Sequence, residues 1–126
     1  MTARSGRRRR RVLVVDDHEM LRSGLSLALT AAGYSVESAA DGLAALASVS
    51  EIRPDVVVLD LRMPVMDGYA TLARLQADPA TADIPVVIAT AADDARSHTL
   101  AAGASGFITK PIDARQLLRE VSLALA

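Results

Sequence analysis

Hydrophobic and polar positions along the chain form short apolar runs that alternate with longer stretches of helical spacing. The most apolar run is residues 56–59, four consecutive residues of which three are β-branched. Such a run predicts a central strand that is buried on both faces of a parallel sheet. Further strands are predicted at residues 11–15, 84–89 and 106–109, and the period-two alternation of residues 34–39 predicts an edge strand.

Between these runs, apolar residues recur every three or four positions and predict five helices. The first helix is predicted at residues 19–32 and the second after Asp41. The third surrounds Leu72 and ends near Asp78, the fourth spans residues 93–102, and the fifth follows Asp113. The residues expected on the inner faces of the second and fifth helices are Leu43, Leu46, Val49, Ile52, Leu117, Leu118, Val121 and Leu123.

The order of these elements predicts the fold class. Five strand-then-helix units without a hairpin signal indicate an α/β protein with a parallel sheet and helices on both faces. The expected fold is a doubly wound, flavodoxin-like (βα)5 domain, a three-layer αβα sandwich with strand order 2-1-3-4-5. In that order the first and third strands are neighbours.

Composition narrows the function classes. The chain has 126 residues, no cysteine and a formal net charge of -1, which fits one domain without disulfides or thiolate metal sites. No stretch approaches the roughly 18 apolar residues of a membrane span. We expect a disordered basic leader at residues 1–10, a folded domain at residues 11–126 that binds neither nucleic acid nor membrane, and a cytoplasmic location.

Polar residues stand at the ends of four predicted strands, and these ends share one edge of a parallel sheet. They are Asp16, Asp17, Asp60, Thr90 and Lys110, the last being the single lysine of the chain. Adjacent carboxylates repel one another, and a bound cation relieves that repulsion. Oxygen-only ligands favour Mg²⁺ or Mn²⁺ over Zn²⁺.

This set of residues suits phosphoryl transfer. Asp60 lies at the centre and is the expected nucleophile, because a carboxylate that attacks phosphorus in line gives an acyl phosphate. Thr90 and Lys110 supply a hydroxyl and an ammonium for the remaining phosphoryl oxygens.

Four motifs carry a resemblance to a known family. They are Asp16-Asp17, the segment 59–68 with sequence LDLRMPVMDG, the strand ending at Thr90, and Phe107-Ile108-Thr109-Lys110-Pro111. Together, from about Arg11 to the C-terminus, they resemble the CheY-like receiver (REC) domain of bacterial two-component response regulators. The resemblance implies that Asp60 accepts phosphate from a histidine kinase, a histidine phosphotransfer protein or a small phosphodonor.

The resemblance also implies roles for the neighbouring residues. Asp17 would bind Mg²⁺ directly, Asp16 would act mainly through water, and the backbone carbonyl of Arg62 would be a further ligand. Thr90 and Lys110 would hold the phosphoryl group. Phe107 matches the switch aromatic of the family, and the Lys110-Pro111 peptide bond would be cis.

The implied protein is a signalling switch that catalyses its own phosphorylation and dephosphorylation rather than an enzyme. Its output surface would be formed by residues 93–102, the strand 106–109 and the last helix, and would contact a downstream effector, an output domain or a second copy in a homodimer. Because no output domain follows the last helix, we expect a stand-alone receiver or one excised from a longer regulator.

Other functions remain open at this stage. A dehalogenase-type phosphoaspartate hydrolase or phosphotransferase needs a second acid two residues after the nucleophile, where this chain has Arg62. A flavodoxin-like cofactor binder needs a phosphate-binding loop that the chain lacks after its first strand, and a degenerate receiver would not keep all five site residues. His18 is interpreted as a loop residue beside the site, and His98 as a helix surface residue.

Overall fold

The computed structural model of the protein describes residues 9–63, 65–91 and 102–126. Its strands are β1 (Arg11–Val15), β2 (Ser35–Ala39), β3 (Val56–Leu59), β4 (Val86–Thr90) and β5 (Gly106–Thr109). Its helices are α1 (Glu19–Ala31), α2 (Gly42–Ile52), α3 (Gly68–Ala77) and α5 (Ala114–Leu125). The helix predicted at residues 93–102 and most of the predicted basic leader lie outside the described residues.

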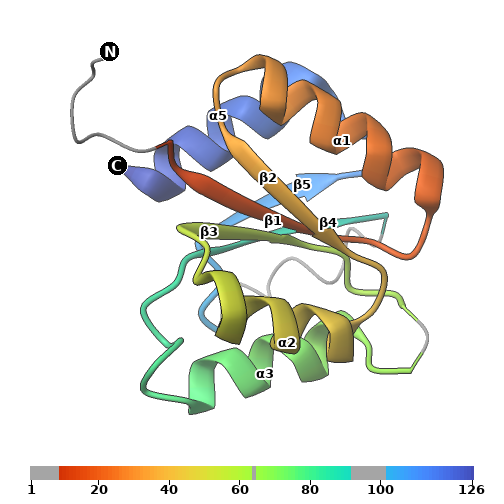
Figure 1. Ribbon diagram of the computed structural model, residues 1–126. Helices are drawn as coiled ribbons and strands as arrows, with labels where there is room; N and C mark the ends of the chain where they lie inside the picture. Colours follow the sequence, from red (N-terminus) through yellow and green to blue (C-terminus); the bar gives the residue numbers. More distant parts are fainter. Residues whose placement is uncertain (1–8, 64, 92–101) are drawn as a thin grey trace.

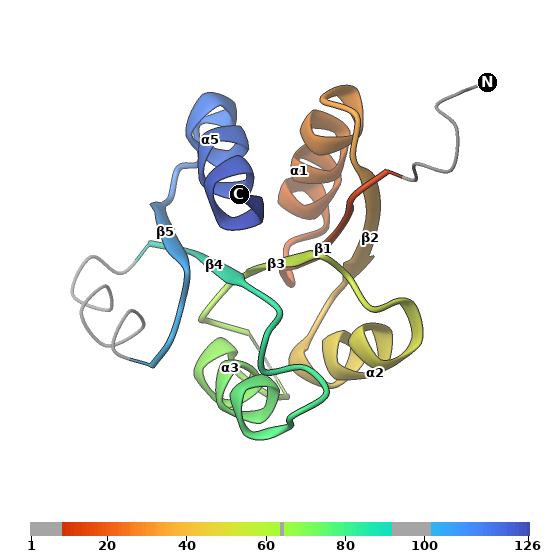
Figure 2. The same ribbon diagram turned by 90° about the vertical axis from the view of Figure 1, so that its left-hand side faces the viewer.

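The five strands form one parallel sheet in the order β2-β1-β3-β4-β5. Helices α1 and α5 cover one face of this sheet, and α2 and α3 cover the other (Figures 1 and 2). The predicted strand order and the three-layer αβα arrangement are therefore confirmed. The order also makes β1 and β3 neighbours, as expected for a doubly wound sheet.

Two apolar layers hold the sheet between its helices. Every residue of β3 and β4 is buried, which explains why these strands are continuous apolar runs rather than alternating ones. The side chains alternate between the two layers, so that Leu59 packs beneath α2 and α3 while Val58 packs beneath α1 and α5. By contrast β2 is largely exposed, as predicted for an edge strand.

Aspartates begin three of the four described helices. Side-chain oxygens of Asp41, Asp67 and Asp113 accept hydrogen bonds from backbone N–H groups in the first turns of α2, α3 and α5. Each cap satisfies a donor that the helix itself leaves unpaired. Helix α1 begins differently, because its N-cap residue is His18 and the imidazole makes no capping hydrogen bond.

Several apolar residues lie on the outside of their helices. Leu43 and Leu123, which were predicted to face inward, are 52% and 62% exposed, so these two predictions are wrong. Met20 and Leu27, which contribute to the apolar spacing of α1, are 89% and 72% exposed. In helices this rich in Leu and Ala, more than one face carries apolar residues at helical spacing. Which of these faces is buried depends on how the helix packs against the sheet.

None of the helices in the part of the chain that the structure describes has the length and apolarity needed to cross a membrane.

Candidate functional site

The end of β1 places two adjacent carboxylates at the edge of the sheet. Asp16 is buried, its backbone N–H donates to the carbonyl of Ala39 at 3.1 Å, and its Oδ1 accepts the backbone N–H of His18 at 2.8 Å. The side chain of Asp17 is 30% exposed. The pair therefore has one fixed member inside the fold and one member that faces the solvent.

Asp60 follows β3 and lies beside this pair. Its backbone N–H donates to the carbonyl of Val15 at 3.0 Å, which ties the end of β3 to the end of β1. Its Oδ1 accepts the backbone N–H of Arg62 at 3.3 Å, and the residue is buried. Burial raises the pKa of Asp60, and this outweighs the Arg62 N–H and the Lys110 charge, which lower it.

Lys110 follows β5, and its ammonium contacts the carboxylates of both Asp16 and Asp60. Its Nζ donates to Asp16 Oδ2 at 3.0 Å and lies 3.3 Å from Asp60 Oδ2, and the side chain is 18% exposed. Burial alone would lower the pKa of this ammonium, but the hydrogen bond to Asp16 and the charges of Asp60 and Asp16 raise it. The peptide bond from Lys110 to Pro111 is cis, as predicted.

Thr90 is the last residue of β4 and pairs in register with Thr109, the residue before Lys110. The backbone N–H of Lys110 donates to the carbonyl of Thr90 at 2.9 Å. The threonine is 1% exposed, yet its hydroxyl has no hydrogen-bond partner among the described residues. A buried hydroxyl without a partner is unfavourable in the resting state, and an additional acceptor in the site would satisfy it.

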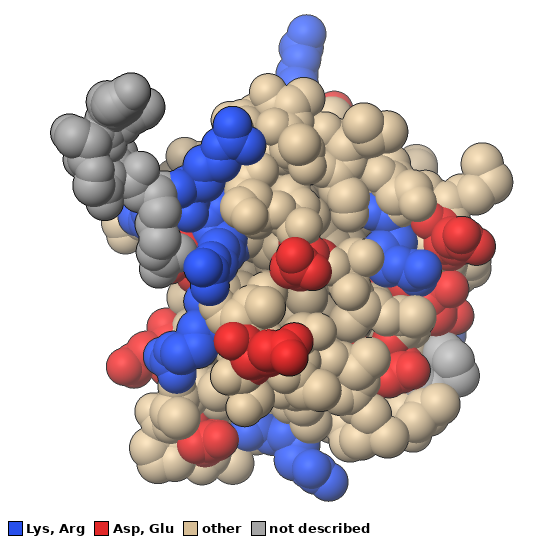
Figure 3. Space-filling view, viewed as in Figure 1, with Lys and Arg blue, Asp and Glu red and all other residues tan. Residues whose placement is uncertain are grey.

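The cluster of carboxylates at this edge of the sheet could hold a divalent cation. Asp16, Asp17, His18 and Asp60 each offer a ligand atom, and these atoms all lie within 4.8 Å of one another. One oxygen of Asp17, Oδ1, is buried and without a hydrogen-bond partner in the described part of the chain. Acidic groups also gather on the right-hand side in Figure 3, the side on which β1 and β3 end in Figure 1. Such a cluster can bind a metal ion.

The loop after Asp60 is fixed by close backbone contacts. The N–H of Gly68 donates to the carbonyl of Leu61 at 2.9 Å, which closes the loop onto the end of β3. A Cβ atom at Gly68 would overlap the carbonyl oxygen of Asp60 and lie 2.5 Å from Cα of Leu61. Glycine is therefore required for α3 to begin directly against the backbone of Asp60.

An arginine on α1 supports the acidic pair. The Nη1 group of Arg22 donates to the backbone carbonyl of Asp16 at 2.8 Å and so holds the peptide unit between Asp16 and Asp17. The sequence analysis missed this residue. It lies six positions after Asp16, near the start of the first predicted helix, but this spacing alone does not show that the side chain turns back to the Asp16 carbonyl.

Phe107, the predicted switch residue, lies in the interior of the fold. It is 7% exposed, pairs in register with Ile88 of β4, and packs in the apolar layer beneath α2 and α3. The ring therefore points inward from β5, the strand that pairs with β4, and β4 ends at Thr90.

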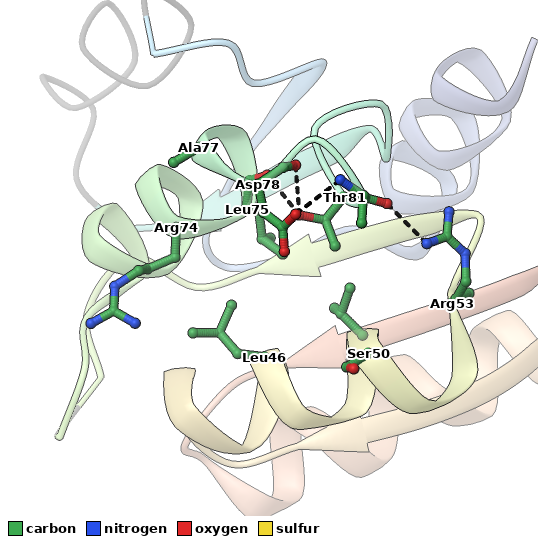
Figure 4. A pocket seen from close by; sticks show the side chains of 10 residues that line it. Leu46, Ser50, Arg53, Arg74, Leu75, Ala77, Asp78 and Thr81 are labelled. Atoms are coloured by element: carbon green, nitrogen blue, oxygen red, sulfur yellow. Dashed lines mark hydrogen bonds between the residues drawn. The ribbon is translucent and has the colours of Figure 1, made fainter.

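Two hollows differ in their relation to this site. An open hollow of about 530 Å³ lies beside it and is lined by Asp17, Leu61, Arg62, Met63, Asp67 and Tyr69. A second hollow of about 580 Å³ lies between the C-terminal ends of α2 and α3 (Figure 4), which are at the opposite end of the sheet. There Arg53 donates to the backbone carbonyl of Ala80 at 2.9 Å, so its side chain stabilises the turn after α3.

Comparison with known proteins agrees with this geometry. Residues 12–122 match the family described as the response regulator receiver domain. The chain belongs to this family. The receiver domains of response regulators act in two-component systems, so the predicted family and signalling class are confirmed, and the dehalogenase-type alternative is not favoured.

Related receiver domains belong to longer proteins. The chain is 46% identical over 113 residues to the response regulator PleD of Caulobacter vibrioides, covering 88% of this chain and 25% of PleD. It is 36% identical over 117 residues to the DNA-binding dual master transcriptional regulator RpaA of Synechocystis, covering 91% of this chain and 48% of RpaA. The chain thus spans about a quarter and about half of these relatives.

Solved structures of receiver domains share the fold. The chemotaxis protein CheY4 of Vibrio cholerae aligns with a TM-score of 0.87 at 33% identity, covering 94% of this chain and 100% of CheY4. The receiver domain of a signal transduction histidine kinase from Syntrophus aciditrophicus aligns with a TM-score of 0.84 at 35% identity, covering 91% and 89%. The proteins that the chain resembles thus include one structure matched over its full length, longer regulators, and a receiver domain of a histidine kinase.

Proposed function

We propose that Asp60 is the phosphoacceptor of this receiver domain and that Lys110, Thr90 and the acidic pair assist its phosphorylation. The observation that supports this most strongly is the convergence on Lys110. Its ammonium lies within hydrogen-bonding range of Asp16 and Asp60, although Asp16 is 94 residues away in the sequence. Placing three charged groups together at a sheet edge is costly for a fold unless the site binds a charged ligand.

The proposed step is an in-line displacement at phosphorus. A carboxylate oxygen of Asp60 forms the new O–P bond while the P–N bond of a phosphohistidine, or the P–O bond of a small acyl phosphate, breaks and its electron pair leaves with the donor. Lys110 Nζ then has a phosphoryl oxygen to pair with in place of the Asp60 carboxylate. The hydroxyl of Thr90, which has no partner in the described part of the chain, donates to a second phosphoryl oxygen.

The metal in this proposal is Mg²⁺ or Mn²⁺. Asp17 would hold it directly through the oxygen that has no hydrogen-bond partner among the described residues, Asp16 would act mainly through water, and Asp60 and the carbonyl of Arg62 would complete the protein ligands. When bound, the ion neutralises the acidic cluster and the incoming phosphoryl charge. The residues present fit this role because all the side-chain donors except His18 are hard oxygens.

The proposed switch couples Thr90 to Phe107. The hydroxyl of Thr90 moves toward the phosphoryl group, and the ring of Phe107 on the adjacent strand holds the inward position seen in the structure. Because Phe107 has no hydroxyl, the inward and outward positions differ mainly in apolar burial. Phosphorylation then shifts an existing equilibrium between two conformations rather than creating a new one.

The proposed partners follow from the chemistry and from the architecture of the relatives. A histidine kinase or a histidine phosphotransfer protein supplies the phosphoryl group in the cytoplasm. An effector protein, an output domain or a second copy of the chain reads the switch on the surface around β5 and α5. The domain catalyses its own phosphorylation from the phosphohistidine donor and its own dephosphorylation.

The test uses intact mass spectrometry with a small acyl phosphate and Mg²⁺. The parent is expected to gain one phosphoryl group, and the gain should disappear in EDTA and in Asp60→Asn. Equal labelling of the parent and of Asp60→Asn would show that Asp60 is not the acceptor. Asp55→Asn is a matched control, because Asp55 lies before β3 rather than after it and should leave the labelling unchanged.

A further inference from the structure

His18 places an imidazole against the acidic pair. The residue directly follows Asp17, and its side chain is 71% exposed. Its Nδ1 atom lies 3.4 Å from Asp16 Oδ1 and 3.4 Å from Asp17 Oδ1. The ring nitrogen therefore lies on the same side of the turn as the carboxylate oxygens, within reach of an ion that they bind.

The backbone holds His18 in this position without using its side chain. Its N–H donates to Asp16 Oδ1 at 2.8 Å, and the residue is extended as the N-cap of α1. The imidazole makes no hydrogen bond to the first turn of the helix. Its Nδ1 atom contacts the two carboxylates, so the acidic pair and not the helix explains the orientation of the ring.

We propose that Nδ1 of His18 is an additional ligand of the ion that Asp17 holds directly and Asp16 holds mainly through water, and that it shifts the selectivity of this site toward first-row transition ions such as Mn²⁺, Co²⁺ and Ni²⁺. This inference rests on the proposed metal site of the receiver domain. It assigns a function to a residue that the sequence analysis interpreted only as a loop residue beside the site.

The distances and the donor type support this role. Two adjacent ligands of an octahedral ion with bonds of about 2.1 Å lie roughly 3 Å apart, and the Nδ1 atom is 3.4 Å from Asp17 Oδ1, the oxygen proposed to bind the ion directly. Imidazole nitrogen is a good ligand for Mn²⁺, Co²⁺ and Ni²⁺, whereas Mg²⁺ favours carboxylate, carbonyl and water oxygens. Removing the imidazole should therefore weaken the binding of Ni²⁺ much more than the binding of Mg²⁺.

The experiment compares metal affinities by isothermal titration calorimetry on tag-free protein, with Mg²⁺ and Ni²⁺ as the probes. In His18→Ala we expect the affinity for Ni²⁺ to fall by about tenfold or more. Substituting a residue that only orients a metal ligand already weakens metal binding by about tenfold, so losing a ligand itself should cost at least as much. The affinity for Mg²⁺ should stay within about twofold of the parent, because a hard ion prefers the oxygens. The matched control is His98→Ala, which removes the other histidine of the chain and should change neither affinity.

A spectroscopic readout identifies the ligand directly. With Co²⁺ bound, the parent and His98→Ala should show paramagnetically shifted imidazole proton resonances, and His18→Ala should lack them. Circular dichroism confirms that the exposed substitution at His18 leaves the fold intact.

The outcomes separate this inference from the proposed function. If His18→Ala binds Ni²⁺ as tightly as the parent, or loses Ni²⁺ and Mg²⁺ equally, the role of His18 in selectivity is wrong. If Asp17→Asn binds Mg²⁺ as well as the parent does, the proposed metal site itself is wrong. Loss of Mg²⁺ binding in Asp17→Asn together with unchanged Ni²⁺ binding in His18→Ala would reject the His18 role alone.

Discussion

Replacing Gly68 with alanine should destabilise the fold through a backbone overlap next to Asp60, the proposed phosphoacceptor. A Cβ atom there would lie 2.5 Å from Cα of Leu61 and 2.9 Å from the carbonyl carbon of Asp60, besides overlapping the carbonyl oxygen of Asp60. All of these are backbone atoms, so no change of side-chain rotamer can relieve the overlap. Either α3 or the end of β3 must shift.

The size of the effect follows from two opposing contributions. Overpacking against a rigid neighbour typically costs about 1–3 kcal/mol, and a backbone neighbour favours the upper end. Alanine also restricts the unfolded chain more than glycine does, which returns about 0.5–1 kcal/mol. The net loss in the free energy of unfolding should be about 2 kcal/mol, equivalent to a melting temperature lower by roughly 6–10 °C for a domain of this size.

The assay is urea unfolding followed by far-ultraviolet circular dichroism, because the chain has no tryptophan to report by fluorescence. Gly24→Ala is the matched control. Apart from neighbouring atoms of its own helix, no atom of residues 9–63, 65–91 or 102–126 lies within 4 Å of a Cβ atom at Gly24, which is inside α1, so alanine should stabilise the fold there by about 0.5–1 kcal/mol. A Gly68→Ala variant that is as stable as the parent, with unchanged phosphorylation, would refute the reasoning.

Three further substitutions test the charges and the hydroxyl of the site. In EDTA at pH 7, Asp60→Asn should raise the free energy of unfolding by on the order of 1 kcal/mol, because burial raises the pKa of Asp60 and penalises its charged form. This gain, measured by urea unfolding, should vanish below about pH 4, where the parent carboxyl is protonated in both states. Lys110→Met leaves two buried carboxylates without their counter-charge and should cost about 3 kcal/mol in EDTA, most of which added Mg²⁺ should restore in a thermal melt. Thr90→Val should be at least as stable as the parent, since it removes a buried hydroxyl that has no partner among the described residues, yet it should slow phosphorylation by about 100-fold in a mass-spectrometric time course.

The strand order and the layers could be predicted because the sequence marks them strongly. The four-residue apolar run of β3 and its neighbours leave little choice of buried faces, and parallel crossovers restrict the winding. The inward faces of the helices were less certain. Leu43 and Leu123 belong to helices in which a second stripe of similar hydrophobicity was available, so local spacing alone could not distinguish the buried face.

The candidate site was predictable where strand ends carry polar residues. Lys110 and Asp60 do lie together, as their positions at strand ends required. The supporting contacts were not predictable, because each depends on how a turn is oriented in space. Arg22 reaches the Asp16 carbonyl, Gly68 admits the backbone of Asp60, and His18 turns toward the carboxylates, and none of these follows from spacing along the chain.

The central claim is that the carboxylate of Asp60 becomes an acyl phosphate. The most direct measurement is borohydride reduction of the protein after treatment with a small acyl phosphate and Mg²⁺, followed by peptide mass spectrometry. Reduction converts a phosphorylated aspartate to homoserine and leaves free carboxylates unchanged. We predict homoserine at position 60, dependent on Mg²⁺. Homoserine at another aspartate, or none under conditions that label the intact protein, would contradict the account.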